Sequence, residues 1–484
     1  MKYNELLKEY KISEVTSNSK KIRNGTAFVA IKGEKFDGNN FIEEAINAGV
    51  SLIFTERKDI VEKYKNIIPV FYTPNARKSL AEIASAIAAE VPTTLIAVTG
   101  TNGKTSTVHY IAQMLSSMGH KTATIGTLGI NLYHNPNYIE FIENTGLTTA
   151  DSVQFNKQLE KLKKEGVDNC VIEASSIGLD QYRLYGRKFK VAGFTSFSRD
   201  HIDYHKSMET YLDAKLLLFD EYLEDGAIAV INSEISEYKT IESFLKQIKR
   251  PFISVGRDGE FKLNFNSGKA DGQEFSIAYK GDQYSVNTKI LGGFQAENIA
   301  ISIAMLESIG YDIQQILSSI KFLTSPPGRL ERVADEGYGS SIFIDYAHTP
   351  DALENVLKEL QKIAKLKGSK VFAVFGCGGD RDKGKRKLMG EVASKYADII
   401  IITDDNPRSE NPEAIRKEIL EGASGAIEIA GRREAIKYAI DNMGNNDIVL
   451  LAGKGHEDYQ IIAGVSYKFS DKEVAREFCD KKSY

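Results

Sequence analysis

A short apolar segment followed by a glycine-rich turn decides the fold of this chain. The segment TLIAV (Thr94–Val98) runs into TGTNGKTS (Thr99–Ser106), after which Val108, Ile111 and Leu115 share one helical face. A buried strand, a glycine turn, a Lys-Thr pair and a helix form the context of a phosphate-binding loop, or P-loop. The turn is two residues shorter than the general GxxxxGK[ST] pattern. The flanking strand and helix disfavour the alternative of an ordinary glycine turn with a surface lysine.

The chemistry expected of this turn is the binding of nucleotide phosphates, and the loop alone does not distinguish a motor, a switch, a kinase and a ligase. Glycines allow backbone N–H groups to point at phosphate oxygens, and the helix N-terminus adds partial positive charge. We expect Lys104 to reach the β- and γ-phosphates and the Thr105 hydroxyl to ligate Mg²⁺. The chain has no NKxD run that would read guanine, which weighs against a GTPase switch. The predicted ATP-binding residues of the loop are Gly100, Thr101, Asn102, Gly103, Lys104, Thr105 and Ser106.

Short apolar runs alternate with amphipathic stretches over much of the chain. One such stretch, Asp351–Lys365, places its apolar residues on one helical face and follows the start signal Thr349-Pro350. The alternation predicts an α/β fold with mainly parallel sheets, and polar, glycine-rich strands between Ser254 and Asn287 predict an antiparallel excursion. The predicted buried strands are Thr94–Val98, Ala227–Ile231, Ile342–Asp345, Val371–Phe375, Ile399–Ile402 and Ile448–Leu451.

The length of 484 residues predicts roughly three domains. Val91-Pro92 precedes the first strong strand, and SPPG (325–328) is the clearest break in the second half. The predicted domains are therefore 1–92, 93–328 and 329–484, of which the central one carries the P-loop.

Composition excludes several classes of protein. The chain is 42% hydrophobic and 26% charged, which rules out wholesale disorder. Its net charge of −4 predicts no nucleic-acid surface, and the widely spaced Cys170, Cys377 and Cys479 predict neither disulfides nor a zinc knuckle. There is neither an N-terminal secretory pattern nor an apolar run near the ~18 residues that a membrane helix needs. We therefore expect a soluble cytoplasmic protein, with no membrane span and no obligatory protein partner visible.

Six motifs resemble, in order, those of the Mur ligases, ATP-dependent amide-forming enzymes of peptidoglycan precursor synthesis. They are TGTNGKTS, FSRDHIDYH, DYAHTPD, GCGGDRDKGKR, DNPRSENP and GKGHEDYQ, and the match runs from about Ser19 to Asp471. The resemblance implies that 1–92 binds the uridine nucleotide of UDP-MurNAc, 93–328 is the ATPase domain, and 329–484 is a Rossmann-like domain for the incoming amino acid. It further implies that ATP phosphorylates the γ-carboxylate of D-Glu in UDP-MurNAc-L-Ala-D-Glu. An amine then attacks the acyl phosphate, and phosphate leaves.

The resemblance also implies catalytic and metal-binding residues in the central domain. Glu173, which ends an apolar strand, matches a Mg²⁺-binding glutamate, and His201 matches a ligand of a second metal. Lys215 matches a lysine carbamylated by CO₂ (N6-carboxylysine), a reaction that requires a neutral amine. From the residues alone, Glu173 could equally be a buried glutamate paired with a lysine, and Lys215 a solvated lysine. The implied catalytic residues are Lys104, Glu173, His201 and Lys215, and the implied metal ligands are Thr105, Glu173 and His201.

Further residues match groups that bind ATP and the nucleotide sugar. The family usually reads FNVxN where this chain has Gln295-Ala296, SSHGL where it has Ile177, and Thr-Asn-Leu where it has Ser196. None of these departures removes a phosphate or metal group. The implied ligands of the adenosine end of ATP are Asn298, Arg329, Asp345 and His348. The implied ligands of the UDP-MurNAc-dipeptide are Ser19, Thr148, Thr149, Ser175, Gln181 and Arg183.

The DNPR motif indicates which amino acid is added. Lysine-adding relatives usually lack its arginine, Arg408, and a guanidinium is the natural partner of the distal carboxylate of meso-diaminopimelate. Meso-lanthionine keeps both zwitterionic ends and fits the motif equally, and an exposed turn arginine remains an alternative. The implied amino-acid-binding residues are Arg381, Asp405, Asn406, Pro407, Arg408, Gly453 and Glu457.

Three other functions compete with a diaminopimelate-adding ligase. A lysine-adding ligase and a folylpolyglutamate synthetase share the P-loop, but DNPR and the muramoyl-contact residues disfavour them. A catalytically silent nucleotide-binding scaffold is the alternative from another class, and retention of Lys104, Glu173 and Lys215 argues against it. Phosphate release that needs both the nucleotide substrate and the amino acid would discriminate a ligase from a scaffold.

Overall fold

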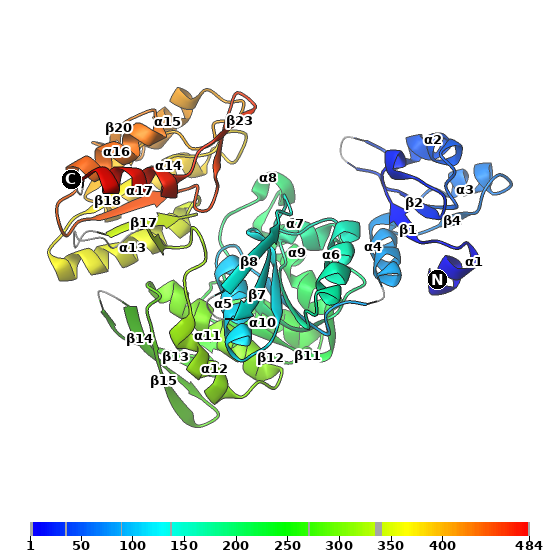
Figure 1. Cartoon of the computed structure of the whole chain (residues 1–484), viewed down its shortest axis with the longest axis horizontal. Coiled ribbons are helices and arrows are strands. Elements are labelled where there is room, and N and C mark those ends of the chain that lie inside the picture. Colours follow the sequence, from blue (N-terminus) through cyan, green and yellow to red (C-terminus); the bar gives the residue numbers. More distant parts are fainter. Residues whose placement is uncertain are drawn as a thin grey trace.

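The computed structural model describes residues 3–33, 36–88, 90–135, 138–269, 272–333 and 341–482. Over these residues, the strands form three sheets that follow one another along the chain, with a small hairpin near the C-terminus (Figure 1). The α/β fold predicted from the sequence is confirmed. The boundaries proposed at 92/93 and 328/329 remain a prediction. The helices of the described residues include none that is long and apolar enough to span a membrane.

The first sheet is small and entirely parallel, with its strands paired in chain order. It lies apart from the C-terminal sheet, and helix α4 leads from it toward the central sheet (Figure 1). The strands are β1 (Glu14–Thr16), β2 (Thr26–Ala30), β3 (Leu52–Thr55) and β4 (Val70–Tyr72). The helices are α1 (Tyr3–Glu9), η1 (Ser19–Lys21), η2 (Gly38–Phe41), α2 (Ile42–Asn47), α3 (Lys58–Tyr64) and α4 (Ala76–Ile87).

The central sheet has the order β15-β14-β13-β12-β11-β10-β5-β9-β6-β7-β8. Its middle is parallel and apolar on both faces, as the sequence predicted. The strands are β5 (Thr94–Thr99), β6 (Thr122–Gly126), β7 (Gly129–Asn135), β8 (Tyr138–Glu143), β9 (Asn169–Glu173), β10 (Phe189–Phe194), β11 (Leu223–Asn232), β12 (Phe252–Gly256), β13 (Phe261–Lys269), β14 (Gly272–Tyr279) and β15 (Asp282–Thr288). The helices are α5 (Lys104–Ser117), α6 (Ser152–Lys164), α7 (Ser176–Asp180), α8 (Ile202–His205), α9 (Met208–Glu221), α10 (Tyr238–Gln247), α11 (Gly293–Ser308), α12 (Ile313–Ser319) and η3 (Ile320–Phe322).

Both edges of the central sheet are antiparallel. The excursion predicted between Ser254 and Asn287 begins later than expected, because β12 pairs in parallel with β11 and β13, and antiparallel pairing starts only between β13 and β14. Four of the five residues of β12 are buried, so this strand continues the parallel sheet. At the other edge the hairpin β7–β8 was not predicted, because the exposed residues of β8 interrupt its apolar pattern.

The third sheet has the order β16-β17-β21-β18-β19-β20 and is parallel except for β16. Helix α13 begins at Pro350 with Thr349 as its N-cap, as the start signal predicted. The strands are β16 (Glu331–Arg332), β17 (Ser341–Asp345), β18 (Val371–Phe375), β19 (Ile399–Ile402), β20 (Ile427–Glu428), β21 (Ile448–Ala452), β22 (Tyr459–Ile462) and β23 (Val465–Lys468). The helices are α13 (Pro350–Lys367), α14 (Lys385–Tyr396), α15 (Pro412–Leu420), α16 (Arg432–Asn442) and α17 (Asp471–Lys482).

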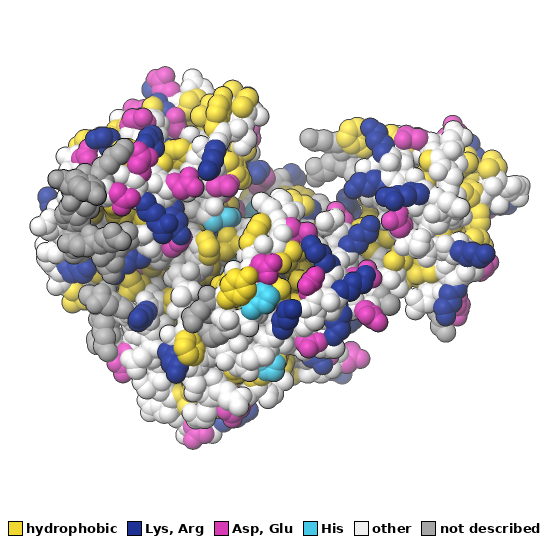
Figure 2. All heavy atoms as spheres, viewed as in Figure 1, with side chains coloured by type: hydrophobic (Ala, Val, Ile, Leu, Met, Phe, Trp, Pro, Cys, Tyr) yellow, Lys and Arg dark blue, Asp and Glu magenta, His cyan; other side chains and the backbone are white. Residues whose placement is uncertain are grey.

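The arrangement of the sheets positions the site. In the central sheet β5 lies between β9 and β10, and Val98 pairs with Glu173 in register. The turn after β5 and the acidic end of β9 therefore meet at one edge of the sheet. Acidic and basic side chains are interspersed over the face seen in Figure 2, in keeping with the small net charge.

Candidate active site

The P-loop conformation depends on two glycines. Gly100 has φ +147°, and a Cβ there would lie 2.1 Å from Thr195 Oγ1. Gly103 has φ +85° and precedes α5, and a Cβ there would lie 2.5 Å from Asn298 Oδ1. Neither position has room for a side chain, and Gly103 adopts a left-handed conformation that disfavours one. The loop is therefore fixed by its backbone, with the first turn of α5 directed at the space a phosphate would fill.

The segment after β10 holds this loop from the side. The Asn102 N–H donates to Ser196 Oγ over 2.8 Å, and the Ser196 hydroxyl donates to the Asn102 carbonyl over 3.0 Å. Thr195 Oγ1 donates to the same carbonyl. The departure at Ser196 thus supports the P-loop rather than weakening it.

Lys104 folds over the loop that carries it. Its ammonium donates to the Gly100 carbonyl over 2.9 Å and to the Thr101 carbonyl over 2.8 Å. Burial lowers the pKa of Lys104, while the nearby carboxylates Glu173 and Asp200 oppose the shift. The ammonium is held at the mouth of the loop, where it would meet the phosphates.

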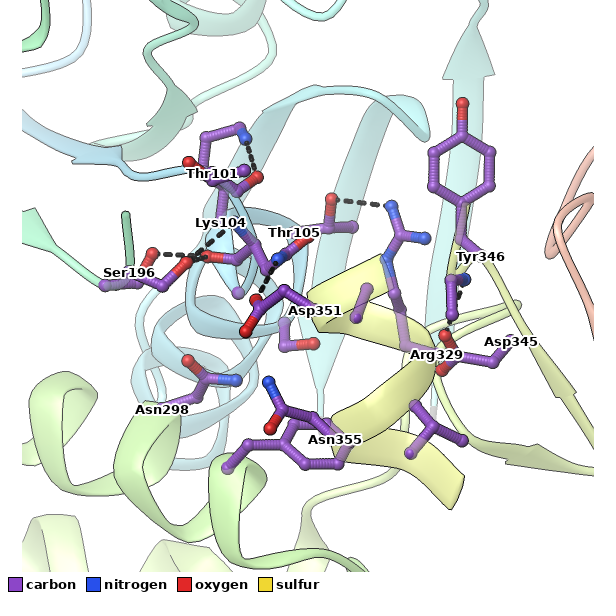
Figure 3. Close-up of a pocket in the computed structure, with 18 of the residues that line it drawn as sticks. Thr101, Lys104, Thr105, Ser196, Asn298, Arg329, Asp345, Tyr346, Asp351 and Asn355 are labelled. Carbon is purple, nitrogen blue, oxygen red and sulfur yellow. Dashed lines mark hydrogen bonds between the residues drawn. The ribbon is translucent and has the colours of Figure 1, made fainter. Parts of the chain in front are cut away.

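Glu173 is the centre of a hydrogen-bonded cluster beside the P-loop. Its carboxylate accepts from Thr105 Oγ1 over 3.0 Å, from the Thr127 N–H over 2.9 Å and from Thr127 Oγ1 over 3.1 Å. Over the part of the chain that the structure describes, no lysine forms an ion pair with Glu173. Arg329 donates to Thr105 Oγ1 over 3.1 Å from beyond the central sheet (Figure 3). Thr127 was missed by the sequence analysis, because no motif includes it.

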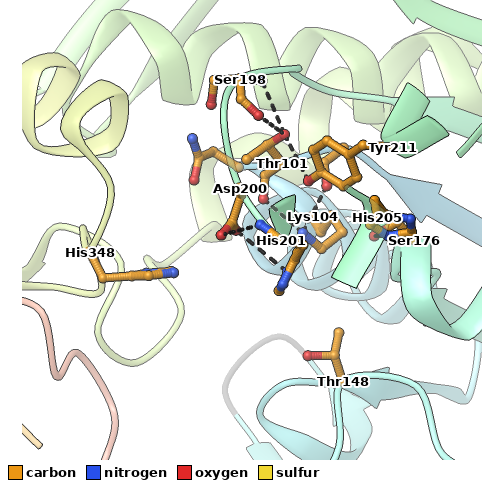
Figure 4. Close-up of polar contacts among 12 residues, drawn as sticks. Thr101, Lys104, Thr148, Ser176, Ser198, Asp200, His201, His205, Tyr211 and His348 are labelled. Atoms are coloured by element: carbon orange, nitrogen blue, oxygen red, sulfur yellow. Dashed lines mark hydrogen bonds and ion pairs between the residues drawn. The ribbon is translucent and has the colours of Figure 1, made fainter. Parts of the chain in front are cut away.

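A second acidic group, Asp200, faces the same space. His201 Nε2 lies 3.5 Å from Asp200 Oδ2, and His348 points toward both residues from the opposite side (Figure 4). Burial raises the pKa of Asp200, but Lys385 and the charges that His201 and His348 carry when they are protonated at low pH outweigh it and leave the pKa below its ordinary value. Burial lowers the pKa of His201 and lowers that of His348 to about 4. Both imidazoles are thus neutral near pH 7 and available as acceptors or ligands.

Lys215 on α9 is 1% exposed and donates to the Gly100 carbonyl over 2.8 Å. Its ammonium lies 4.4 Å from the centroid of the Tyr211 ring. Burial, and after it the nearby Lys104 ammonium, lower the pKa of Lys215 well below its ordinary value. The side chain is therefore not the solvated lysine of the alternative interpretation.

A cavity of about 260 Å³ lies between the P-loop, the start of α11 and the residues after β17. Asp345 accepts from the backbone N–H groups of Leu330 and Ala347, and burial raises its pKa to about 6. The Arg329 guanidinium lies 4.5 Å from the centroid of the Tyr346 ring. The cavity gathers every predicted ATP-binding residue except Gly100; lining residues include Thr101, Asn102, Gly103, Lys104, Thr105, Ser106, Asn298, Arg329, Asp345 and His348 (Figure 3).

The predicted nucleotide-sugar residues form two groups. Thr149 Oγ1 donates to the Glu173 carbonyl and accepts from Ser175, while Arg183 donates to the Thr149 carbonyl over 2.7 Å and to Gln181. Thr148 approaches Thr127 at 3.1 Å and lines the cavity. These residues form one wall next to Glu173. Ser19 lies in η1 of the first sheet unit, away from them (Figure 1).

The predicted amino-acid residues meet beyond the carboxyl ends of β19 and β21. Asn406 donates to Glu457 Oε2 over 2.8 Å and accepts from the Ile461 N–H over 2.9 Å. Burial raises the pKa of Glu457, and the charge of Asp405 adds to the shift. Gly453 has φ +108°, and a Cβ there would lie 3.8 Å from Asp405 Oδ2. Pro407, which follows Asn406, is buried in the same turn.

Arg408 lies against the glycine turn after β18. It has φ +51°, is half-buried, and donates from Nη1 to the Gly379 carbonyl over 2.7 Å. A Cβ at Gly378 would lie 2.7 Å from Arg408 Nη1 and 3.8 Å from Arg381 Cγ, so the two arginines flank this glycine. The backbone of Arg408 also donates to the Ile461 carbonyl. Arg408 is thus packed between two segments instead of extending from an exposed turn.

A second cavity of about 660 Å³ adjoins the first, and its lining includes Thr148 of the predicted nucleotide-sugar residues and Glu457 of the predicted amino-acid residues. Thr127, Thr148 and Tyr346 line it and also line the first cavity, and Glu457 lines its far side. A reacting carboxylate near Thr127 and an amino acid near Glu457 would therefore share one space. The sequence analysis missed several residues because they belong to no phosphate or amino-acid motif or were quoted without a role: Thr127, Thr195, Asp200, Tyr346, Asp351 and Lys454.

The site is that of a P-loop enzyme in which the phosphate-binding cavity lies next to a cavity for a second substrate. Comparison with known proteins is consistent with this class. Residues 11–97 match the Mur ligase family, catalytic domain; residues 98–306 match the Mur ligase middle domain; residues 328–455 match the Mur ligase, glutamate ligase domain. The chain belongs to the Mur ligase family. The predictions of this family and of a ligase are confirmed.

Individual relatives agree with this assignment. A UDP-N-acetylmuramoyl-L-alanyl-D-glutamate--2,6-diaminopimelate ligase of Rickettsia conorii is 44% identical over 476 residues, covering 98% of this chain and 97% of the relative. A solved structure of an enzyme of the same name is 32% identical with a TM-score of 0.69, covering 98% of this chain and 96% of that one. The MurF ligase of Thermotoga maritima in complex with ADP has a TM-score of 0.62 at 20% identity, covering 98% of both chains, and shows the shared fold.

Proposed function

We propose that this protein is an ATP-dependent ligase that adds meso-diaminopimelate to the D-Glu of UDP-N-acetylmuramoyl-L-alanyl-D-glutamate. The observation that carries the proposal is the shared space between the two cavities. It places the P-loop and Glu173 at one end and Glu457 at the other, with Thr127 and Thr148 common to both. The names of the relatives support the choice of substrates.

In the proposed mechanism, the P-loop binds the phosphates of ATP. Lys104 turns from the Gly100 and Thr101 carbonyls to the β- and γ-phosphates, and the N–H groups of the loop hold their oxygens. Arg329, Asp345, His348 and Asn298 hold the nucleoside end. The γ-phosphoryl group passes to the D-Glu γ-carboxylate, the amine attacks the acyl carbon, and phosphate leaves from the tetrahedral intermediate.

The residues beside the P-loop fit Mg²⁺. Thr105 and Glu173 offer oxygen ligands, which Mg²⁺ prefers, and His201 adds a nitrogen for a second site. The described residues hold no cluster of three or more His, Cys, Asp or Glu side chains that would form a full cage, as suits an ion that retains waters and phosphate ligands. When bound, Mg²⁺ neutralises charge on the phosphoryl oxygens.

The proposed carbamate would form on Lys215. Carbamylation requires a neutral amine, and burial beside Lys104 favours that state. The modification replaces a cation by an anionic group that faces the loop carbonyl of Gly100 and the neighbouring Tyr211. We propose that the carbamate on Lys215 positions neighbouring groups next to the P-loop.

Phosphate release tests the proposed function directly. The purified chain is incubated with MgATP and UDP-N-acetylmuramoyl-L-alanyl-D-glutamate, with diaminopimelate, lanthionine, lysine or glutamate in parallel. We expect release that depends on the nucleotide substrate and is fastest with diaminopimelate or its analogue lanthionine. Preference for lysine would identify the lysine-adding alternative, and no release with any amino acid would identify a silent scaffold.

A further inference from the structure

Lys454 is a fully buried cation whose hydrogen-bond and ion-pair partners among the described residues are predicted amino-acid-binding residues. It follows β21 and is 0% exposed. Its Nζ lies 3.4 Å from Glu457 Oε2, 3.4 Å from Asn406 Oδ1 and 3.7 Å from Asp405 Oδ1. Lysine is almost never fully buried unless it is paired, so the ammonium and these three acceptors form one unit. Neither the P-loop nor the DNPR motif explains this lysine.

The charges of this unit are unequal. Two carboxylates, Asp405 and Glu457, face one ammonium, and Asp405 Oδ1 is buried without a hydrogen-bond donor among the residues that the structure describes. The neighbouring cation Arg432 is already paired, at 2.6 Å, with Asp471. A buried carboxylate oxygen without a donor is costly, which makes it an acceptor for a cationic group of a ligand.

We propose that Lys454 is a positioning residue of the amino-acid pocket: its ammonium aligns Asp405, Asn406 and Glu457, and neutralises one carboxylate so that the other receives an ammonium group of the substrate. The proposal rests on the proposed function and specifies how that pocket selects a diamino acid. Arg408, two residues after Asn406 in the same turn, is then the group that binds a carboxylate of the substrate. The pocket then offers one net negative charge to the ammonium and one guanidinium to the carboxylate of a zwitterionic end of the substrate.

Removal of the Lys454 ammonium has a defined electrostatic consequence. Burial and Asp405 already raise the pKa of Glu457, whereas Lys454 opposes the shift. Without Lys454 the pKa of Glu457 rises further, so its carboxylate becomes protonated at a higher pH. Amino-acid binding that needs this carboxylate is then lost at a higher pH as the solution is acidified. The titratable groups that face Glu457 are Asp405, Lys454, Arg432, Tyr346 and Tyr459.

The experiment compares wild type, Lys454→Met and Lys454→Arg by phosphate release with diaminopimelate between pH 6 and pH 9. We expect Lys454→Met to raise the KM for diaminopimelate about tenfold or more. We also expect the acid limb of the pH profile, where kcat/KM falls as the solution is acidified, to move to higher pH. The KM for ATP and acyl-phosphate formation, followed by positional isotope exchange in ATP, stay near wild type. Lys454→Arg, which retains the charge, retains the wild-type acid limb.

A matched control separates positioning from loss of stability. Ile419→Ala in α15 removes a fully buried side chain from the same domain, so it lowers the melting temperature without moving the acid limb. An unmoved acid limb in a folded Lys454→Met protein, or a moved one in Lys454→Arg, would overturn the inference alone. Absence of wild-type turnover with every amino acid would overturn the proposed function and the inference together.

Discussion

The phosphate half and the amino-acid half of the site are built in different ways. The phosphate half is one continuous stretch, Gly100–Ser106, whose backbone is held by hydrogen bonds to the hydroxyls of Thr195 and Ser196 and to the Ser196 carbonyl. The amino-acid half combines three separate turns, 378–381, 405–408 and 453–457, through side chains that reach from one turn to another. The first is preorganised by local backbone geometry, whereas the second exists only once the C-terminal sheet has formed. Variants in the two halves should therefore impair different steps.

The largest effect is expected at Lys104 in the phosphate half. Lys104→Ala removes the cation that we place on the β- and γ-phosphates, so we expect kcat to fall by at least ~100-fold. Phosphate release at saturating diaminopimelate measures it. The control is Lys164→Ala, an exposed lysine of α6 paired with Glu160, which should retain full activity. Turnover close to wild type in a folded Lys104→Ala protein would contradict the P-loop assignment.

The next largest effect is expected at Lys215. Lys215→Ala removes the proposed carbamate, so we expect nearly complete loss of turnover with partial recovery when short-chain carboxylic acids are added. The recovery follows because a free carboxylate can occupy the emptied position and supply the same charge. Lys190→Ala, an exposed lysine on β10, is the matched control and should not respond to these acids. Full activity of Lys215→Ala without any response would mean that carbamylation is not needed.

In the amino-acid half, Arg408→Ala should change selectivity rather than ATP use. Loss of a guanidinium partner at a desolvated carboxylate costs about 2–5 kcal/mol. This range corresponds to a rise in the KM for diaminopimelate of roughly 30-fold to several-thousand-fold. Lysine lacks the distal carboxylate, so its already poor use should change far less, and the KM for ATP should hardly move.

Steady-state kinetics with both amino acids check this expectation, with Arg433→Ala in α16 as the surface control. Equal damage to lysine and diaminopimelate use would show that Arg408 only supports its turn.

The smallest effect is expected at Ser196, which supports the P-loop from outside. Ser196→Ala removes both side-chain hydrogen bonds to the Asn102 backbone, and each is worth about 1 kcal/mol. We expect the KM for ATP to rise several-fold while the KM for diaminopimelate stays constant. Ser196→Asn, which introduces the residue common in the family, should retain most of the affinity. A larger change for the amino acid than for ATP would show that the halves are not independent.

The contacts that join the first and third sheets to the central sheet also differ, because only those of the third sheet involve site residues. Arg187 donates to the Ser85 and Ala88 carbonyls at the end of α4, and Lys78 pairs with Glu221 at 2.5 Å. The part of the chain that carries the first sheet is therefore attached to the central part away from the site. The joint to the C-terminal sheet runs through site residues, among them Arg329 with Thr105 and Asn102 with Asp351. Ligands that occupy the cavity must therefore interact with this second joint.

Much of the fold could be predicted from the sequence because its signals are local. The buried strands at 371–375 and 399–402 agree residue for residue with β18 and β19, and Thr349-Pro350 marks the start of α13. The hairpin β7–β8 was missed because the exposed edge strand β8 lacks a continuous apolar run. The all-parallel first sheet was missed although β2 and β3 are buried along their whole length, because these strands are only five and four residues long. The antiparallel edge was placed too early because Ser254 and Gly256 gave the second half of β12 the same polar, glycine-rich character as the strands that follow it.

The sequence by itself determined the phosphate loop, because the glycines, the lysine and the threonine that it needs are neighbours along the chain. It also indicated the amino-acid residues through motif resemblance, without saying which of them touch. Only the tertiary structure decided that Thr127 holds Glu173, that Lys215 is buried against Gly100, and that Lys454 faces Asp405 and Glu457. These properties depend on burial and on segments brought together from distant parts of the chain, and neither is encoded in the spacing of residues.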